Sequence, residues 1–244
     1  EIGLSSGSWT WVVAAHSSVK HLTVVEINPG YVELIRKYPD HDVILTDPRV
    51  RITVDDGRRW LKRNPQARFD FILMNTTFHW RSDATNLLSK EFIELCRSHL
   101  KEGGVVYYNT TGAEEVVFTA ASVFKHVTTF GSFVAASDRP FDMSDEAKRE
   151  NLLRFTSEGR PILSPDTPAT RKVLEELVSA PLPDMGEELR RRPNLPVITE
   201  DNMLSEYKRM HNKLTPLYRW YDPNRAWFAS PPAPAPGVPI FRFP

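Results

Sequence analysis

Two acidic residues follow predicted strands at positions that suit a bound nucleoside. Glu26 ends the β-rich run HLTVVEIN, about 20 residues after Gly7, where a carboxylate can accept hydrogen bonds from the two hydroxyl groups of a ribose. Asp56 follows the run VRITVDD and precedes Gly57, so its carboxylate could accept a hydrogen bond from an adenine amino group. Structural roles are the alternatives, because an acid at Glu26 favours the helix that begins near Pro29 and Asp is a preferred N-cap residue.

The turn GLSSGSW brings small residues to the junction between a strand and a helix. Gly3, Ser5, Ser6 and Gly7 would let a ligand approach the backbone closely, and the following helix offers unpaired N–H groups at its start. Many tight strand-to-helix turns share this composition, so a ligand loop and a plain turn both remain open.

A third candidate is the polar turn NTTFHW, which follows the buried strand FDFILM. The turn after such a strand is where chemistry usually occurs in an open α/β sheet. Asn75 takes the first position of this turn, and an amide cannot act as a general base. His79 is the candidate for proton transfer, since the unperturbed pKa of histidine is about 6.5. The alternative is that Trp80 packs over the site while His79 is exposed to solvent.

These candidates require strands and helices that alternate along the chain. Strand patterns occur at 21–28, 50–56, 69–75 and 105–111, and helical patterns at 10–18, 29–39, 57–65, 89–104 and 114–127. The helix at 89–104 is amphipathic, and we expect Gly103 and Gly104 to end it. The alternation predicts an α/β protein with a doubly wound, mostly parallel, Rossmann-like sheet.

The pattern divides the chain into three regions. Residues 1–138 form the Rossmann-like domain, with a truncated first strand, because Glu1-Ile2-Gly3 reads as the end of a strand. The chain also lacks an initiator Met, so we expect a fragment or an excised domain. Residues 139–230 form a mainly helical C-terminal extension packed on the first domain. Residues 231–244 form a proline-rich tail of polyproline type.

Composition excludes several classes of protein. The 244 residues are 41% hydrophobic, enough for a sizeable core, and 31 basic residues balance 31 acidic residues. Zero net charge gives no field that would favour nucleic acid or an anionic membrane. The single cysteine, Cys96, excludes an intramolecular disulfide and a cysteine-based metal cluster, and we expect it to be a buried thiol in a reducing compartment. The run Arg190-Arg191-Arg192 is typical of a solvated helix end.

The order of these motifs resembles a known family. GLSSG, VVEIN, VDDG, ILMNTT and LKEGGVV follow the S-adenosylmethionine-dependent methyltransferase fold. The segments VEINPGYVELIRKY, DPRVRITVDDGRRWL and SKEFIELCRSHLKEGGVVYYNT are similar to those of the spermidine synthase, or polyamine aminopropyltransferase, family. The closer resemblance is to spermidine synthase-like domains fused to transporter-like membrane segments. It covers residues 1–138 well and the remainder loosely.

The resemblance implies a nucleotide site on one side of the cleft. The nucleotide would be S-adenosylmethionine, its decarboxylated form or the methylthioadenosine product, bound as a substrate without a metal. It would be contacted by Gly3, Ser5, Ser6, Gly7, Glu26, Asp56 and Gly57.

Departures from the family pattern fall mainly on the acceptor side. The family has an Asp at the position of Ser6, and its signature after the strand is Asp-Ser-(Ser or Thr)-Asp-Pro. Here Asn75 replaces the first Asp, which is the usual base and amine anchor, and Phe78 replaces the second, which binds the amine. A polyamine with a pKa of about 10 arrives protonated. A site without these carboxylates should therefore transfer poorly to putrescine, although the ring of Phe78 can contact a cation.

Other residues could supply acceptor contacts. Asp83 follows in the same loop and could restore an amine-binding charge. Tyr107, Tyr108 and Asn109 end the next strand and could line the same cleft, with Tyr108 as our candidate. Neighbours on a strand face opposite ways, so a core role for at least one tyrosine is the alternative. Asp201, beside Glu200, could bind a cation or cap a helix.

Three functions fit these residues. The first is an aminopropyltransferase that uses decarboxylated S-adenosylmethionine and an unusual amine acceptor. The second is a methyltransferase, and the third is a catalytically inactive nucleotide- or polyamine-sensing domain of a membrane protein. No clear basic partner for a nucleotide carboxylate lies near GLSSGSW, which favours the first over the second. The resemblance further implies a cytoplasmic domain, tethered to a membrane in the intact protein, with a polyamine as small-molecule partner, a homodimer as its assembly and no nucleic acid.

Overall fold

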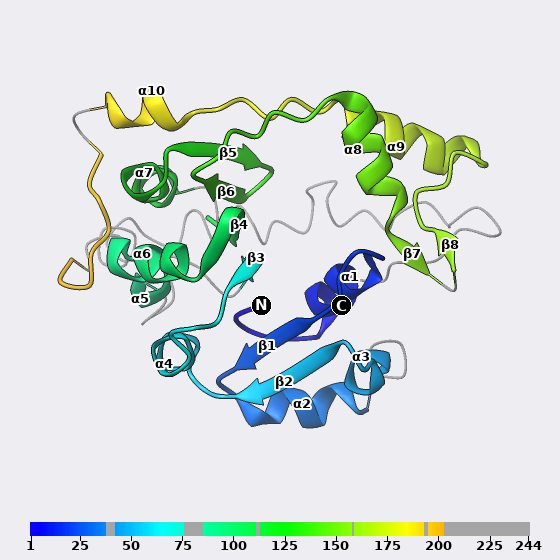
Figure 1. The fold of residues 1–244 in the computed structure, drawn as a ribbon, viewed down its shortest axis with the longest axis horizontal. Coiled ribbons are helices and arrows are strands. Elements are labelled where there is room, and N and C mark those ends of the chain that lie inside the picture. The colour runs from blue at the N-terminus through cyan, green and yellow to red at the C-terminus, as the bar shows by residue number, and fades with distance from the viewer. Residues whose placement is uncertain (38–41, 76–84, 111–112, 158, 193–194, 203–244) are drawn as a thin grey trace, which may run out of the picture. The chain divides into compact units, whose positions relative to one another are not determined.

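The computed structural model describes residues 1–37, 42–75, 85–110, 113–157, 159–192 and 195–202 (Figure 1). The predicted helix after residue 202 and the proline-rich tail at 231–244 lie outside the described residues. No helix in the described part of the chain is long and apolar enough to cross a bilayer.

The strands form a mixed sheet in which parallel and antiparallel pairs occupy different parts (Figure 1). β1 pairs with β2 and β3 pairs with β4 in parallel, whereas β6 pairs antiparallel with both β4 and β5. Ile2 pairs in parallel with Val25 on one side and Met74 on the other, so it stands where the predicted truncated first strand should be. The strands are β1 (Leu22–Glu26), β2 (Val50–Val54), β3 (Phe69–Met74), β4 (Leu100–Asn109), β5 (His126–Phe130) and β6 (Phe133–Ser137).

Helices connect these strands as the alternating pattern predicts. Pro29 occupies the first turn of its helix and the side chain of Asn28 caps it, which fits the fixed φ of proline and the preference of Asn for the N-cap. The helices are α1 (Ser8–Ala15), α2 (Pro29–Ile35), α3 (Val43–Thr46), α4 (Gly57–Arg63), α5 (Thr85–Leu88), α6 (Lys90–Ser98) and α7 (Glu114–Val123).

The predicted end of the amphipathic helix was wrong. α6 ends at Ser98, and β4 begins at Leu100 and includes Gly103 and Gly104. Gly103 has a φ of 75°, a conformation that favours glycine. A Cβ on Gly104 would lie 3.1 Å from the carbonyl oxygen of Phe69. The two glycines therefore serve an irregular part of the strand, where its register with β3 shifts, and do not stop the helix.

The main hydrophobic core lies between α6, α7 and one face of the sheet. It includes Phe92, Val116, Val106 and Cys96, which are fully buried. Each large apolar side chain buried in this way contributes about 1.5–3 kcal/mol to folding. Burial raises the pKa of the Cys96 thiol to about 12, so this cysteine is the inert core residue that the sequence predicts. A second cluster packs α1, α2 and α3 against the half of the sheet that contains β1.

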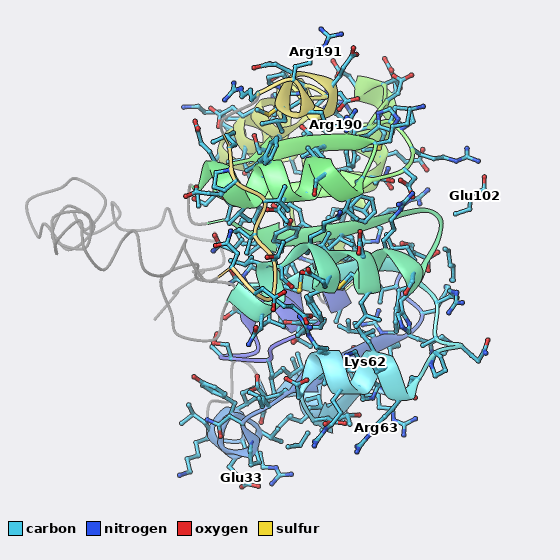
Figure 2. The ribbon with its side chains drawn as sticks, turned by 90° about the vertical axis from the view of Figure 1, so that its left-hand side faces the viewer. Glu33, Lys62, Arg63, Glu102, Arg190 and Arg191 are labelled. Carbon is cyan, nitrogen blue, oxygen red and sulfur yellow. The ribbon has the colours of Figure 1, made fainter. Side chains whose placement is uncertain are left out.

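The region after residue 138 adds helices and a short hairpin. These elements are α8 (Asp145–Leu153), β7 (Thr156–Ser157), β8 (Arg160–Pro161), α9 (Pro168–Ser179) and α10 (Gly186–Arg190). The prediction of a solvated arginine run holds for Arg191 and Arg192, which pair with glutamates one turn earlier on the surface. It also holds for Arg190, which is exposed at the end of α10 and whose Nη1 donates to the carbonyl oxygens of Ala121, Phe124 and Lys125. Figure 2 shows Arg191 projecting outward from α10.

Candidate functional site

The carboxyl ends of the parallel strands bring the predicted site residues to one edge of the sheet. Glu26 ends β1 and Asp56 follows β2, and the backbone N–H of Asp55 donates to the carbonyl oxygen of Glu26 at 3.0 Å. Asn75 and Asn109 occupy the ends of β3 and β4. Ligands bind at this edge of open α/β sheets, so the four residues define the candidate site.

The carboxylate of Glu26 hydrogen-bonds to the backbone of the loop of small residues and so holds it at the end of β1. Its Oε2 accepts hydrogen bonds from the backbone N–H groups of Leu4 at 2.6 Å and Ser5 at 3.2 Å, and its Oε1 accepts from Asn28 N at 2.8 Å. The side chain is 3% exposed. A carboxylate has about four acceptor positions, so three backbone bonds leave room for a ribose hydroxyl. The predicted loop and the predicted acid are thus in contact, and the bond from Asn28, the N-cap residue of α2, also ties Glu26 to the start of that helix.

The loop itself needs backbone conformations that few residues adopt. Gly3 and Gly7 have φ values of 90° and 79°, and Ser5 has a φ of 48°. A Cβ on Gly7 would lie 2.6 Å from Cδ1 of Ile44, so glycine is required there for space as well as for conformation. The hydroxyls of Ser6 and Ser8 lie 2.8 Å apart. The loop is therefore tightly packed against α3 at Gly7, whereas the side chain of Ser5 is exposed and that of Ser6 is half-buried.

Asp56 has the capping role that was its structural alternative. Its Oδ1 accepts a hydrogen bond from the backbone N–H of Arg59 at 2.8 Å, at the start of α4. Gly57 packs against Ile2, since a Cβ there would lie 2.6 Å from Ile2 Cγ2. The second carboxylate oxygen of Asp56 is not needed for the cap, so capping and contact with an adenine amino group remain compatible.

Asn75 lies beside Asn109, which the sequence analysis names among the residues that could line the cleft. Nδ2 of Asn109 donates to Oδ1 of Asn75 at 3.1 Å. In the sequence, the tripeptide Asn-Thr-Thr begins at Asn75, the residue after β3, and again at Asn109, the last residue of β4, and this repetition was a signal that could have identified the pair. The position that the resemblance assigns to a catalytic carboxylate thus holds an amide that is hydrogen-bonded to another amide.

The prediction that Tyr108 lines the cleft is not what the structure shows. Tyr108 is fully buried in the main core, and burial raises the pKa of its hydroxyl far above the usual range. Tyr107 faces the opposite side of the sheet and is half-buried, because neighbours on a strand alternate. Of the two tyrosines, Tyr107 is therefore the one placed to meet a ligand.

Three predicted acceptor residues, Phe78, His79 and Asp83, lie outside the described residues. Their roles stay predictions.

The acidic pair at 200–201 is divided between two environments. Glu200 forms an ion pair with Arg58, the second residue of α4, and Arg58 also contacts the hydroxyl of Ser89 at 3.3 Å. The guanidinium lies 5.0 Å from the ring centroid of Phe92, and burial lowers the pKa of Arg58. Asp201 is exposed in the turn that follows. Of the two acids, Asp201 is the one that leaves its carboxylate to solvent or to a ligand.

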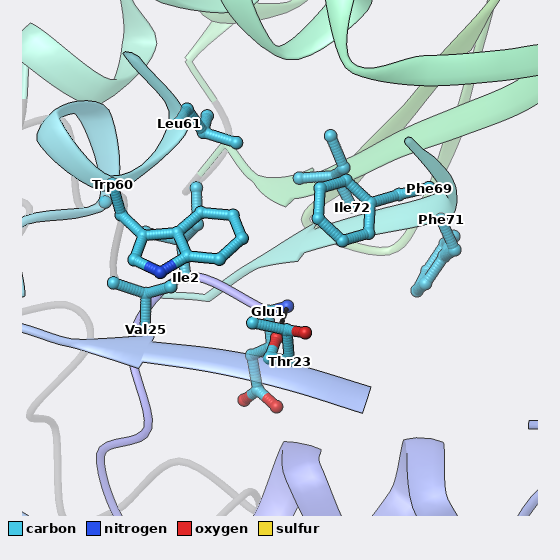
Figure 3. Close-up of a pocket in the computed structure, with 10 residues that line it drawn as sticks. Glu1, Ile2, Thr23, Val25, Trp60, Leu61, Phe69, Phe71 and Ile72 are labelled. Atoms are coloured by element: carbon cyan, nitrogen blue, oxygen red, sulfur yellow. Dashed lines mark hydrogen bonds between the residues drawn. The ribbon is translucent and has the colours of Figure 1, made fainter. Parts of the chain in front are cut away.

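An apolar hollow beside the sheet includes one of the predicted site residues, Gly57, but not Glu26, Asp56 or Asn75. It is lined by Trp60, Phe69, Phe71 and Thr23, among others, between β1, α4 and β3 (Figure 3). Phe69 and Thr23 belong to the beginnings of their strands, whereas Glu26 and Asn75 follow the ends. The hollow is therefore not the candidate site.

The residues at the carboxyl edge fit a nucleoside better than a metal. A loop with serine hydroxyls, a buried carboxylate at a strand end and a capping Asp provide the donors and acceptors that a ribose and an adenine require. Among the residues that the structure describes, no group of three or more His, Cys, Asp or Glu is placed to hold a metal ion.

The site residues at the carboxyl edge lie in a part of the chain that is similar to known proteins. The sequence matches the model of the spermine/spermidine synthase domain over residues 2–141. It is 36% identical to polyamine aminopropyltransferase 1 of Pseudomonas aeruginosa over 126 residues, which are 49% of this chain and 43% of that protein. The chain therefore spans less than half the length of this curated relative.

Two solved structures have a similar fold. Spermidine synthase from Thermotoga maritima superposes with a TM-score of 0.54 and 21% identity, over 74% of this chain and 64% of the other. A spermidine synthase in complex with the transition state analogue AdoDATO gives a TM-score of 0.52 and 21% identity, over 74% and 63% of the two chains. These similarities confirm the predicted Rossmann-like class.

Proposed function

The chain belongs to the spermine/spermidine synthase domain family, and from this premise we propose that it binds decarboxylated S-adenosylmethionine and transfers the aminopropyl group to an amine acceptor. The single observation that carries the proposal is the contact between Glu26 and the loop of small residues. A buried carboxylate holding the backbone of Leu4 and Ser5 at the end of β1 is placed for the ribose of a nucleotide.

The nucleotide side of the proposed site has a role for each residue. Glu26 binds the ribose hydroxyls, Asp56 accepts from the adenine amino group, and the loop from Gly3 to Gly7 lies against the sulfonium-bearing chain. The complex of a related synthase with AdoDATO supports a ligand of this class. No metal is required, because the sulfonium makes the adjacent carbon electrophilic without one.

The acceptor side differs from that of an ordinary polyamine site. The attacking nitrogen needs a lone pair, and a protonated aliphatic amine must first lose a proton to a base. Asn75 cannot accept that proton. We therefore propose an altered acceptor site, with Asn75 orienting the acceptor and His79 as the candidate base.

The experiment that tests the proposal is calorimetric titration with three nucleotides: decarboxylated S-adenosylmethionine, S-adenosylmethionine and methylthioadenosine. We expect the decarboxylated form to bind best and Glu26→Ala and Asp56→Ala to abolish binding. Glu33→Ala is a matched control, since Glu33 pairs with Arg36 on the exposed surface of α2.

Other outcomes identify the alternatives. Preference for S-adenosylmethionine over its decarboxylated form would favour a methyltransferase. Nucleotide binding without turnover on any amine would favour a sensing domain. Absence of binding by all three nucleotides would refute the proposal.

A further inference from the structure

A row of four aromatic side chains crosses the sheet face that carries Asn75 and Asn109. We call Trp9, Phe71, Tyr107 and Phe133 the aromatic floor. Phe133 pairs with Asn109 in the register of β4 and β6, so the side chains of these two residues share one face. Trp9 lies in the first turn of α1, two residues after Gly7. The floor therefore begins beside the asparagine pair and next to the candidate nucleotide loop.

The rings of the floor stack on one another. Tyr107 lies between Phe133, at 4.8 Å between ring centroids and 16° between planes, and Phe71, at 6.0 Å and 28°. Since β4 lies between β3 and β6, the two phenylalanines cover opposite faces of the tyrosine ring. Trp9 contacts Phe133 at 5.1 Å with a tilt of 50°. Phe71 is 43% exposed, and the other three are half-buried.

This stacking determines which ligands the floor favours. The face of an aromatic ring is negative and attracts cations, whereas its edge is positive. The faces of Tyr107 are occupied by its neighbours, so the central ring of the floor offers its edge to a ligand. Burial raises the pKa of Tyr107, which keeps its hydroxyl neutral. Among the described residues, the cation–ring contacts are those of Arg58 and Arg97, with rings of the main core on the other face of the sheet.

The Asn75–Asn109 pair also favours a neutral ligand group over a cation. The two amides, joined at 3.1 Å, carry no net charge, and the oxygen of Asn75, which accepts from Asn109, has a second lone pair for a donor. An alkylammonium placed there would lose hydration without gaining a counter-ion from either amide. A neutral amino group could hydrogen-bond to an amide oxygen at little cost.

We propose that the acceptor is an aromatic amine, whose planar ring lies on the aromatic floor while its neutral amino group hydrogen-bonds to the Asn75–Asn109 pair. This inference rests on the proposed function and names the acceptor class for it. The amino group of an aromatic amine is unprotonated at pH 7, because its lone pair is delocalised into the ring. It therefore needs no carboxylate base before it attacks.

The aminopropyl transfer needs no reactants other than the amine and the nucleotide, with water as the proton acceptor. The nitrogen lone pair forms a bond to the propyl carbon beside the sulfonium, and the carbon–sulfur bond breaks with its electron pair going to sulfur. Sulfur leaves as the neutral thioether of methylthioadenosine. The alkylated nitrogen is positive and acidic, and it releases its proton to water.

The test compares two isomeric amines of formula C8H11N that differ in the position of the amino group. 4-Ethylaniline is neutral at pH 7, and 2-phenylethylamine is a cation; putrescine is the aliphatic reference. Each is titrated into the protein saturated with methylthioadenosine. We expect 4-ethylaniline to bind at least tenfold more tightly than the other two, a difference of about 1.4 kcal/mol. With decarboxylated S-adenosylmethionine, mass spectrometry should detect the N-aminopropyl product of 4-ethylaniline.

Variants test whether the aromatic floor and the Asn75–Asn109 pair cause the preference for 4-ethylaniline. Phe133→Leu should weaken the binding of 4-ethylaniline about tenfold and leave the nucleotide affinity unchanged. Phe133→Met is a second variant if the first is poorly folded. Val173→Ala is the control on another element, because Val173 is 43% exposed on α9. Asn75→Asp should reverse the preference toward 2-phenylethylamine, whereas Asn151→Asp, on α8, should not.

Equal or tighter binding of putrescine or 2-phenylethylamine to the unchanged protein would overturn the inference while leaving the proposed function intact. Binding of methylthioadenosine with no binding of 4-ethylaniline would do the same. Failure of the protein to bind the nucleotide at all would instead remove the proposed function and the inference with it.

Discussion

The side-chain amide of Asn109 donates to the amide oxygen of Asn75 across the ends of two adjacent parallel strands. This bond orients Asn75 at the position where the family resemblance expects a carboxylate. Replacement of Asn109 by Ala should therefore destabilise the protein by about 1 kcal/mol, the usual net value of one hydrogen bond. Urea unfolding measures this loss.

The same variant should also affect acceptor binding, because Asn75 would no longer be held in one orientation. Asn109→Ala combined with Asn75→Ala should cost less than the sum of the two single changes. Additive costs would show that the two amides act independently.

The buried carboxylate of Glu26 should matter for stability as well as for nucleotide binding. Glu26→Gln replaces one acceptor oxygen by an amide N–H that would face a backbone donor. Since hydrogen bonds to charged groups contribute about 1.5–3 kcal/mol each, we expect a loss of about 2–3 kcal/mol in urea unfolding. Glu33→Gln, whose carboxylate is 69% exposed in a surface pair, should change stability by less than about 0.5 kcal/mol. Equal effects of the two variants would contradict the structural role of Glu26.

The loop glycine can be tested against a glycine of similar φ in open space. Gly7 has a φ of 79° and its added Cβ would lie 2.6 Å from Ile44, which is 1% exposed and cannot easily move. Gly131 has a φ of 57°, and no atom lies within 4 Å of its added Cβ. Gly131→Ala should cost about 1–2 kcal/mol from backbone strain alone, and Gly7→Ala should cost at least about 1 kcal/mol more from overpacking. Thermal unfolding of the two variants measures the difference.

The sequence predicted the strands and helices of the first half because their hydrophobic periods and caps are local. It placed Glu26, Asp56 and Asn75 at one edge, since parallel strands must gather their carboxyl ends there. The sequence prediction was wrong at Gly103 and Gly104. A glycine pair after a helical pattern indicates the end of a helix, and the local sequence does not reveal that the pair belongs to the following strand. The structure brings Gly104 close to Phe69 and Gly103 close to Arg139, and both partners are distant in sequence.

Other failures also concern partners that are far away along the chain. Alternation on a strand separates Tyr107 from Tyr108 but does not say which of them faces the core. That choice depends on α6 and α7, which cover the face of Tyr108. The carbonyl partners of Arg190 at the end of α7 lie 65 to 69 residues earlier, so a local pattern could not predict them either.

Asp184 should make stability depend on pH. It joins the segment before α10 to β5, where its Oδ2 lies 2.6 Å from Nδ1 of His126 and its Oδ1 accepts from the backbone N–H groups of Val127 and Gly186. Partial burial would raise the pKa of Asp184, but these hydrogen bonds and the charge of His126 outweigh it and lower the pKa below its usual value.

The sign of the pH effect follows from this lowered pKa. The ionised form is favoured in the folded state, so its contribution is present above the unfolded pKa of about 3.9 and is lost as the pH falls through the folded value. Asp184→Asn should cost about 1 kcal/mol at pH 7, because the side chain is 42% exposed and solvent screens its charge. The difference between the two proteins should shrink below about pH 4. A difference that stays constant from pH 7 to pH 3 would show that ionisation of Asp184 is not involved.

The ion pair between Arg58 and Glu200 should stabilise the start of α4 from a distance of more than 100 residues in sequence. Lys90 N donates to the carbonyl oxygen of Ile198 at 2.8 Å, so the segment that carries Glu200 is fixed by its backbone as well. The side chain of Arg58 is 19% exposed and that of Glu200 is 43% exposed, which makes the pair less screened than a surface pair.

A double-mutant cycle with Arg58→Met and Glu200→Gln should therefore give a coupling free energy of about 1 kcal/mol. The matched control is the cycle between Arg36 and Glu33, whose side chains are 59% and 69% exposed and whose coupling should be close to zero. Because Arg58 follows the Asp56–Gly57 turn directly, Glu200→Gln should also weaken nucleotide binding, whereas Glu33→Gln should not. Equal coupling in the two cycles would show that Glu200 contributes no more than an exposed surface charge.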